Sequence, residues 1–216
     1  MMLGLNPARH LGRLLVSECA AEDIAEEGPL GVKVISGGSG LRELAEADEF
    51  GRESLREKLR AYYPKFDFVV IDTSPGIGDH VLGFLRDADE ILLVTTPEPT
   101  SLRDTYAATK AIFGKVPGAQ PSLVVNMASS ESAAAGAVNA LNSVTQKFLD
   151  RRYDDWFRIE SDPIIGRAIC DRRPAALSYP RSPSVTSLRR IARTLMDTGA
   201  QIAKPVQTGG RQLVLG

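Results

Sequence analysis

The stretch that decides the fold is FVVIDTSPGIGD, residues 68–79. Four apolar residues, Phe68 to Ile71, run without interruption into Asp72, and a polar loop punctuated by glycine and proline follows. Such a run is typical of a strand buried on both faces, as in parallel sheets. An acid at the carboxyl end of such a strand stands where open α/β sheets bind ligands. Two interpretations of Asp72 stay open: an acid that holds Mg²⁺, as in phosphoryl transfer, or a residue that ends a strand and begins a turn.

Composition indicates an ordinary soluble chain. The 216 residues are 43% apolar and 25% charged, and this length suits one domain with a full core. There is no apolar run of membrane-spanning length and no secretory signal, so we expect a cytoplasmic protein. The two cysteines and two histidines form no metal-binding spacing and no disulfide framework. Residues 1–108 carry 11 basic and 19 acidic side chains, and residues 109–216 carry 15 and 8. This asymmetry indicates a basic face but is too mild to predict nucleic-acid binding.

Strand and helix signals alternate along the whole chain. Apolar strand signals at 32–35, 68–71, 91–95, 122–126 and 156–159 alternate with helical patterns at 18–27, 51–63, 80–86, 100–113, 131–151 and 183–202. This alternation predicts an α/β fold with a doubly wound, mostly parallel sheet. We expect residues 1–203 to form a single domain and residues 204–216 to form a loose tail.

One glycine-rich segment invites a phosphate-binding interpretation. SGGSG, residues 36–40, lies between a strand signal and a helix signal, as phosphate loops do. A P-loop, however, requires G-x-x-x-x-G-K-[ST]. No lysine follows Gly40, and Gly114-Lys115 is followed by Val116 instead of a hydroxyl residue. We therefore interpret SGGSG as a plain turn.

A longer string carries a resemblance to a known family. VVIDTSPGIGDHVLGFLRDADEILLVTTPEPTSLRDTYAATKAI, residues 69–112, resembles the middle of the MinD/ParA family of dimeric P-loop ATPases, above all the flagellar-number regulators of the FlhG or FleN type. Four further segments resemble this family: MLGLNPARHLGRLL, GVKVISGGSGLRELA, LVVNMASSESAAAGAVNAL and IESDPIIGRAICDRRPAAL. The likeness covers about residues 2–195. It implies a P-loop NTPase fold and a nucleotide-switched ATPase that regulates flagellar number, flagellar placement or cell division.

The resemblance implies a role for each matching residue. Asp72 matches the Walker B acid, which orders the shell of the Mg²⁺ ion. Asn126 matches the residue that recognises adenine. Asp162 lies in the loop beside the base, where Glu160 stands in place of the usual proline. The positions that match switch II, whose backbone senses the γ-phosphate, are Thr73, Ser74, Pro75, Gly76 and Gly78. The implied cofactors are ATP and Mg²⁺.

The family opens with a segment that has no counterpart in these residues. It comprises a strand, a lysine-containing phosphate loop, a helix and a strand that ends in the switch I aspartate. Without it we expect no intact catalytic set and no measurable ATP hydrolysis, because positioning and charge neutralisation supply this catalysis. The family's first strand is central, so residues 68–71 would offer an unpaired internal edge, which aggregates or recruits a partner. A start placed too late, at Met1 or Met2, explains this better than a rearranged, truncated chain.

The helix predicted at 183–202 is amphipathic, which bears on whether the chain contacts a membrane or another protein. Its apolar positions are Leu188, Ile191, Ala192 and Leu195, flanked by Arg189, Arg190 and Arg193. MinD-like proteins end in an amphipathic helix that binds acidic lipid, so the resemblance implies peripheral contact with the inner face of the plasma membrane. An ordinary helix packed on the sheet is the alternative. The resemblance also implies a homodimer and a flagellar GTPase as partner. A second function class stays open: a nucleotide-independent interaction module that keeps the family scaffold.

Overall fold

The computed structural model describes residues 3–38, 40–73, 76, 78–116, 118–202 and 211–215; at 41, 198–202 and 211–215 it describes the backbone alone. The helices are α1 (Arg13–Val16), α2 (Gly40–Glu46), α3 (Glu49–Arg60), α4 (Asp79–Asp87), α5 (Pro99–Lys115), α6 (Glu131–Leu149), α7 (Pro163–Cys170), α8 (Ala175–Ser178) and α9 (Pro183–Ile202). The strands are β1 (Glu26–Glu27), β2 (Lys33–Val34), β3 (Phe68–Asp72), β4 (Glu90–Thr95), β5 (Ser122–Ala128), β6 (Trp156–Glu160) and β7 (Arg211–Leu215). Short 3-10 helices span Ala21–Ile24, Pro29–Gly31 and Tyr63–Lys65.

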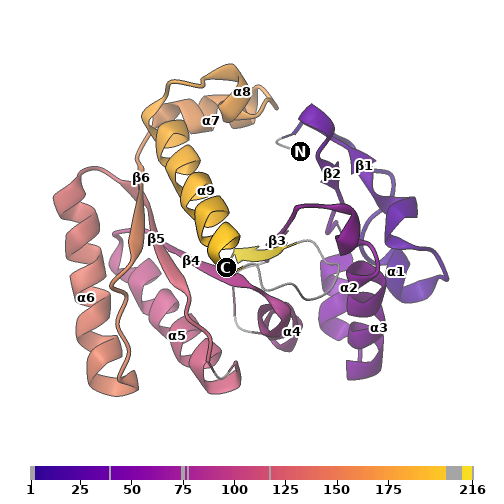
Figure 1. Cartoon of the computed structure of the whole chain (residues 1–216), viewed down its shortest axis with the longest axis horizontal. Helices are drawn as coiled ribbons and strands as arrows, with labels where there is room; N and C mark the ends of the chain where they lie inside the picture. Colours follow the sequence, from indigo (N-terminus) through magenta and orange to yellow (C-terminus); the bar gives the residue numbers. More distant parts are fainter. Residues whose placement is uncertain are drawn as a thin grey trace.

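The main sheet is parallel, and helices pack on both of its faces. Within the described residues it has five strands in the order β3-β7-β4-β5-β6, and each ladder is parallel. Leu93 of β4 belongs to the large core cluster that also includes Ile112 of α5 and Leu141 of α6. The neighbouring Leu92 points to the other face, where it packs with Ile191 of α9. Successive strand residues thus contact different helices, and the predicted doubly wound α/β fold is confirmed (Figure 1).

The N-terminal segment forms a small unit beside the main sheet (Figure 1). β1 and β2 pair antiparallel with each other, with Glu27 opposite Lys33. The helix predicted over 18–27 is wrong, because this stretch holds one 3-10 turn and the strand β1. The turn at Gly28, whose N–H donates to the carbonyl of Val32 at 2.7 Å, folds the chain back into a hairpin. The predicted strand at 32–35 is therefore present as β2 but lies outside the main sheet.

β3 is the edge strand of the sheet. The side chains of Phe68 and Val70 are 45% and 58% exposed, whereas Val69 and Ile71 pack against the core. The prediction of a strand buried on both faces was wrong, because the face that carries Phe68 and Val70 is not covered. A strand with one open face leaves alternate side chains in contact with solvent.

Residues 211–215 form a strand instead of part of a loose tail. β7 lies between β3 and β4 and runs parallel to both. The chain therefore fills, with its own last described segment, the place beside Asp72 where we expected an unpaired internal edge. Figure 1 accordingly shows β7, in yellow, in the middle of the molecule next to β3. The prediction of a loose tail was wrong for residues 211–215, while 203–210 and 216 lie outside the described residues.

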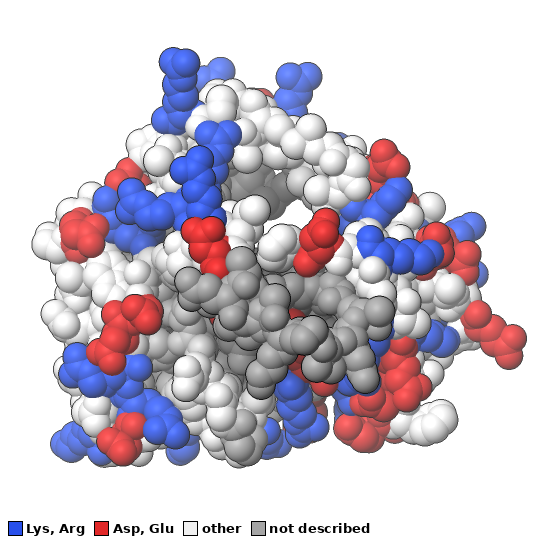
Figure 2. Space-filling model, viewed as in Figure 1, with Lys and Arg blue, Asp and Glu red and all other residues white. Residues whose placement is uncertain are grey.

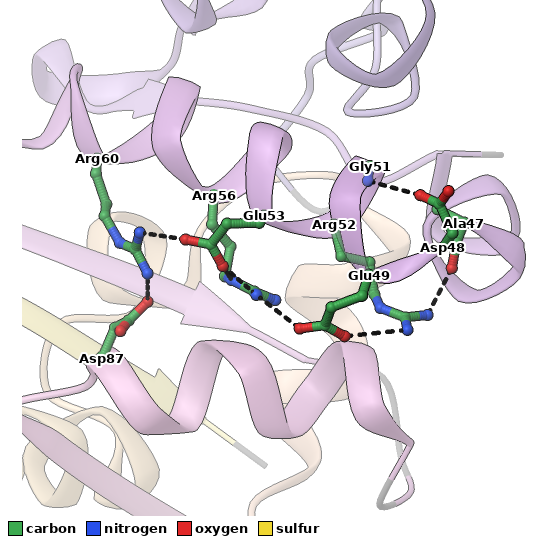
Figure 3. Close-up of polar contacts among 9 residues, drawn as sticks. All are labelled: Ala47, Asp48, Glu49, Gly51, Arg52, Glu53, Arg56, Arg60 and Asp87. Carbon is green, nitrogen blue, oxygen red and sulfur yellow. Dashed lines mark hydrogen bonds and ion pairs between the residues drawn. The ribbon is translucent and has the colours of Figure 1, made fainter.

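A ladder of ion pairs runs along α3 and reaches α4 (Figure 3). The buried guanidinium of Arg56 binds Glu53, with Nε at 3.0 Å from Oε2, and approaches Glu49 at 3.5 Å. Arg60 binds the other oxygen of Glu53 at 2.7 Å and also pairs with Asp87 at the end of α4. Because Arg60 pairs with an acid of α4, the ladder fastens the N-terminal helices to the helix that follows the β3 loop.

Candidate functional site

Polar residues that the sequence singles out lie at one edge of the sheet. Asp72 is the last residue of β3, Asn126 lies near the end of β5, and Asp162 follows β6 after one intervening residue. The carboxyl ends of parallel strands share an edge, and this is where open α/β sheets bind ligands. Three strand spacings separate β3 from β5, and the ladders place Asp72 level with Ser122, four residues before Asn126. Asp72 and Asn126 therefore lie about 20 Å apart across and along the sheet. The surface in Figure 2 is hollowed between the α7–α8 region and the N-terminal elements.

Asp72 opens the loop that we predict to be switch II. Its side chain is exposed, and Thr73 after it is half-buried. Gly76 has a φ of +123°, and an added Cβ would meet nothing within 4 Å, so the backbone conformation alone favours glycine there. Gly78 is the N-cap residue of α4. The other two singled-out positions of this loop, Ser74 and Pro75, lie outside the described residues.

The donor set at Asp72 fits a weakly ligated magnesium ion. Mg²⁺ keeps several of its waters and takes one or two protein carboxylates together with phosphate oxygens. In the described part of the chain, no group of three or more His, Cys, Asp or Glu side chains could hold a metal. A cation at Asp72 would therefore draw most of its ligands from water and from a bound phosphate. The magnesium role of Asp72 stays a prediction.

Asn126 lies at an irregularity of β5. Its Oδ1 accepts a hydrogen bond from the backbone N–H of Met127 at 2.9 Å. Met127 has a φ of +57° and is 61% exposed. The pairing of β5 with β6 shifts between Val125 and Ala128, so the chain bulges just after Asn126. Because the carboxamide oxygen is engaged locally, the Nδ2 amide is the group with which Asn126 could donate to a base.

Asp162 fastens two helices at the end of β6. Its Oδ1 accepts from the backbone N–H of Ile164 at 3.0 Å, which caps α7. Its Oδ2 accepts from the hydroxyl of Ser184 at 2.8 Å and from the backbone N–H of Ser184 at 3.3 Å. The hydrogen bond from Ile164, followed by those from Ser184, holds the pKa of Asp162 below its usual value. Its predicted place beside a base stays a prediction, but its carboxylate has a clear structural role.

Glu160 stands where the family has proline, and its carboxylate has a partner. Oε1 lies 2.5 Å from Nη2 of Arg158, two residues earlier in β6. Nε of the same arginine lies 2.9 Å from Oε2 of Glu131, in the first turn of α6. The departure from the family pattern therefore introduces an acid that is neutralised by an arginine of its own strand.

A hydroxyl cluster that was not predicted from the sequence lies at the end of β4. The hydroxyl of Thr95, which is 1% exposed, lies 3.1 Å from that of Ser101 in α5. Oγ of Ser101 also accepts from the backbone N–H of Thr96 at 2.9 Å. These contacts fold the loop TPEPTS back onto its strand, at the same edge as Asp72. The signal that could have found them is a hydroxyl pair that flanks two prolines directly after a strand.

SGGSG packs against the backbone of the N-terminal segment. The carbonyl of Ser36 accepts from the N–H of Leu11 at 2.8 Å. A Cβ added to Gly40 would lie 2.1 Å from the nitrogen of Gly12, and one added to Gly38 would lie 2.9 Å from Cβ of His10. These close approaches give the glycines a packing reason, as expected for a plain turn.

The final helix packs on the sheet with part of its apolar face. Ile191 is 6% exposed, and Leu195 packs beside it on the sheet cluster of Leu92 and Val124. Lys and Arg side chains gather over α7, α8 and the start of α9, where the charge asymmetry predicted a basic face (Figure 2). Within the described residues, no helix has the length and apolar character needed to cross a membrane.

Comparison with known proteins places the chain in a family. Residues 55–196 match the ParA family model, described as the NUBPL iron-transfer P-loop NTPase. The antiactivator FleN of Pseudomonas aeruginosa is 30% identical over 192 residues, which make up 89% of this chain and 69% of FleN. The chain belongs to the MinD/ParA family of P-loop NTPases. The family predicted from the string around Asp72 is thus confirmed, including its likeness to FlhG/FleN proteins.

Two further proteins are similar in sequence to this MinD/ParA-family chain. An uncharacterized ATP-binding protein of Methanocaldococcus jannaschii is 29% identical over 86% of the chain and 66% of its own length. The flagellum site-determining protein YlxH of Helicobacter pylori is 30% identical over 51% of the chain and 37% of its own length. The chain therefore spans about two thirds or less of these curated relatives.

Solved structures share the fold. The cell division ATPase MinD of Pyrococcus furiosus has a TM-score of 0.69 at 21% identity, covering 91% of this chain and 79% of that one. The septum site-determining protein MinD of Pyrococcus horikoshii, complexed with Mg-ADP, has a TM-score of 0.65 at 21% identity and covers 94% and 80%. The chain thus shares its fold with these two structures.

Proposed function

We propose that this chain is the base-binding and switch-bearing part of a nucleotide-switched ATPase that regulates spatial positioning, either of flagella or of cell division. The observation that carries the proposal is the placement of Asp72 and Asn126 at the carboxyl ends of their strands, about 20 Å apart. An elongated nucleotide with its base near Asn126 and its Mg²⁺-bound phosphates near Asp72 fits such a span. The flagellar relatives named above support the process.

Residues 1–216 supply more of the predicted contacts to the base of a nucleotide than to its phosphates. The base half has Asn126 and the loop of Asp162, whereas the phosphate half has Asp72 and the switch loop but no G-x-x-x-x-G-K-[ST] sequence. Lysine and the amide cradle supply most of the charge neutralisation in phosphoryl transfer. We therefore propose that these residues by themselves bind ATP weakly and do not hydrolyse it. An activity with Mg²⁺ that Asp72→Ala abolishes would overturn this part.

Ligand titration followed by NMR tests the base half. Adenosine and Mg-ATP, each at millimolar concentration, should shift the side-chain amide signal of Asn126, and their affinities should be similar because phosphate contacts add little. Asn126→Ala should weaken both by about tenfold, or 1.4 kcal/mol. Asp104→Ala is the matched control, since this acid is exposed on α5 and pairs only with Arg103 among the contacts the structure describes. Failure of both ligands to perturb Asn126 would contradict a base site.

That failure would favour the second candidate, a nucleotide-independent interaction module. An apolar groove of about 300 Å³ between α5 and α6 supports it. Leu102 and Tyr106 of α5 and Val144 and Phe148 of α6 line this groove. Phe148 is 62% exposed, and exposed apolar surface of this kind marks interaction sites. If variants that lack the proposed nucleotide contacts, such as Asn126→Ala, still bind a partner protein, this candidate is supported.

We further propose a cytoplasmic homodimer, with a flagellar GTPase as one class of partner and membrane contact at α9. Because Ile191 packs on the sheet, lipid contact would use the exposed Leu188 and Met196, which are 44% and 55% exposed. Co-sedimentation with anionic vesicles tests this. Leu188→Glu should reduce binding severalfold, and the same loss with Val16→Glu, an exposed apolar residue of α1, would show a non-specific effect of charge.

A further inference from the structure

One strand joins β3 to the rest of the sheet. β7 pairs with β3 along Phe68–Asp72 and with β4 along Glu90–Leu92. Within the described residues, β3 has no other strand partner. The attachment of β3, and with it the position of Asp72 at the sheet edge, therefore depends on a segment about 140 positions further along the chain.

Release of β7 would leave a slot that fits a single strand. Neighbouring strands lie about 4.8 Å apart, so β3 and β4 would face each other across about 10 Å. β4 would keep its ladder with β5, but β3, whose Phe68 and Val70 are already exposed, would lose all of its described pairing. Parts of a domain can open locally at a free energy below that of global unfolding.

We propose that this slot exchanges its strand between copies of the chain, so that β7 of a second copy enters it in parallel and in the same register. The register of β7 against β3 shows why the same strand of a second copy would suit the slot. Val70 lies opposite Leu213 and Ile71 opposite Val214, which pairs apolar residues across the ladder. A second copy offers the identical segment and reproduces every one of these pairings. Exchange of an identical terminal element is a low-cost route to a dimer.

Chain length permits both arrangements. Eight residues, 203–210, separate the end of α9 from β7, and they can span at most about 30 Å. A short link gives the strand an effective concentration in the millimolar range for the slot of its own chain. Exchange is therefore expected when chains refold together at high concentration, and the swapped dimer should then persist on dilution, because release requires β7 to leave the slot again.

Cross-linking between two single-cysteine chains tests the exchange. Both chains carry Cys19→Ser and Cys170→Ser; one also carries Val70→Cys and the other Leu213→Cys with a mass tag. Residues in register on neighbouring strands lie within disulfide reach. After joint refolding from guanidinium chloride and oxidation, we expect a tagged–untagged disulfide dimer. Gln212→Cys in the tagged chain is the control: it is one residue out of register and on the opposite face, so its yield should be about tenfold lower.

A chain that carries both Val70→Cys and Leu213→Cys reports the arrangement in one copy. If it forms an internal disulfide while the mixed single-cysteine chains give no more dimer than the out-of-register control, the strand stays with its own chain and the proposal is wrong. Absence of both disulfides would show that 211–215 does not occupy the slot and would also overturn it. Circular dichroism checks folding; should Val70→Cys fail to fold, Phe68→Cys with Arg211→Cys repeats the test in register.

Light scattering on the unaltered chain distinguishes the strand-exchanged dimer from a dimer that forms only when nucleotide is bound. The swapped dimer should form after refolding at high concentration with or without Mg-ATP, and it should survive dilution for hours. A dimer that appears only with Mg-ATP would support the proposed function and contradict strand exchange. A chain that stays monomeric after every refolding condition would contradict strand exchange and leave the base-binding proposal standing.

Discussion

The hydroxyl of Ser184 donates to the carboxylate of Asp162 at 2.8 Å, so that one acid joins the first turns of α7 and α9. Ser184 is completely buried, and the same carboxylate also caps α7 through Ile164. The loop that we predict to lie beside the base is therefore held by α9. Any change that loosens the start of α9 should also displace this loop.

Replacement of Asp162 tests this junction. Asp162→Ala removes the cap of α7 and the acceptor for Ser184, so it should lower the melting temperature by several degrees. Asp162→Asn should cost less, because asparagine is also a good N-cap and keeps one acceptor oxygen. Thermal unfolding followed by circular dichroism measures both. Equal melting temperatures for Asp162→Ala and the unaltered chain would show that the junction does not contribute to stability.

The same acid predicts a dependence of stability on pH. The pKa of Asp162 is lowered in the folded chain, first by the N–H of Ile164 and then by Ser184. Its stabilising contribution is therefore present above the unfolded value of about 3.9 and is lost as the pH falls through the lower folded value. The urea concentration at the unfolding midpoint should therefore fall as the pH is lowered from about 5 to about 3. This fall should be larger for the unaltered chain than for Asp162→Asn. Parallel curves would contradict the prediction.

A buried polar network ties the chain before β6 to α5 and α6. Asn142 donates to the carbonyl of Tyr153 at 3.0 Å and accepts from its N–H at 2.8 Å, while the hydroxyls of Tyr153 and Thr109 lie 2.8 Å apart. Asn142→Ala leaves two buried backbone groups unpaired and should cost about 2–4 kcal/mol. Tyr153→Phe should cost only about 1 kcal/mol, because Thr109 also donates to the carbonyl of Thr105. Chemical denaturation that ranks the two in reverse would contradict this account.

Two tyrosines should ionise late. Burial raises the pKa of Tyr63 and of Tyr153 to about 12. Because the folded pKa lies above the unfolded value of about 10, folding is favoured below pH 10 and loses stability as the pH rises from about 10 to 12. Absorbance at 295 nm should show late ionisation that vanishes in denaturant, and Tyr153→Phe should remove part of it. Ionisation of every tyrosine of the folded chain near pH 10 would contradict the burial.

A glycine of α4 makes room for Arg56. A Cβ at Gly83 would lie 3.1 Å from Cζ of Arg56 and closer still to its Nη1. Alanine is otherwise better than glycine inside a helix by about 0.5–1 kcal/mol. We therefore expect Gly83→Ala to destabilise the unaltered chain by about 1 kcal/mol and to stabilise an Arg56→Ala chain by about 0.5–1 kcal/mol. A double-mutant cycle in urea measures this; the same sign in both chains would contradict the contact.

The SGGSG turn should not tolerate a side chain at its last residue. A Cβ at Gly40 would lie 2.1 Å from the backbone nitrogen of Gly12, which has no flexible side chain to move aside. Gly40→Ala should therefore destabilise by about 2 kcal/mol or more. The control is Gly114→Ala in α5, where nothing lies within 4 Å, and it should be neutral or stabilising by up to about 1 kcal/mol. Equal stability of the two variants would contradict a packing role for the turn.

Much of the helical part of the fold could be predicted from local signals. Pro183 after Ser182 marked the start of α9, and Asp162-Pro163 marked the start of α7, because capping and the fixed φ of proline act within a few residues. The string after Asp72 identified the family. The role of Asp162 between two helices could not be predicted, since Ser184 lies 22 positions away and no local rule connects them.

The exposure of β3 could not be predicted for a related reason. An apolar run such as Phe68–Ile71 indicates a strand, but it does not specify which other strand lies beside it or which helix covers it. The same holds for residues 211–215, whose short segment after α9 resembled a tail.

The amino-acid sequence by itself determined the family, the alternation of strands and helices, and the acid that ends β3. The tertiary structure decided that β3 is an edge strand and that 211–215 fills the slot between β3 and β4. The physical reason is the range of the forces involved. Helix periodicity and capping depend on residues within a turn or two, whereas strand pairing depends on which backbone edges remain unpaired after distant parts of the chain have come together.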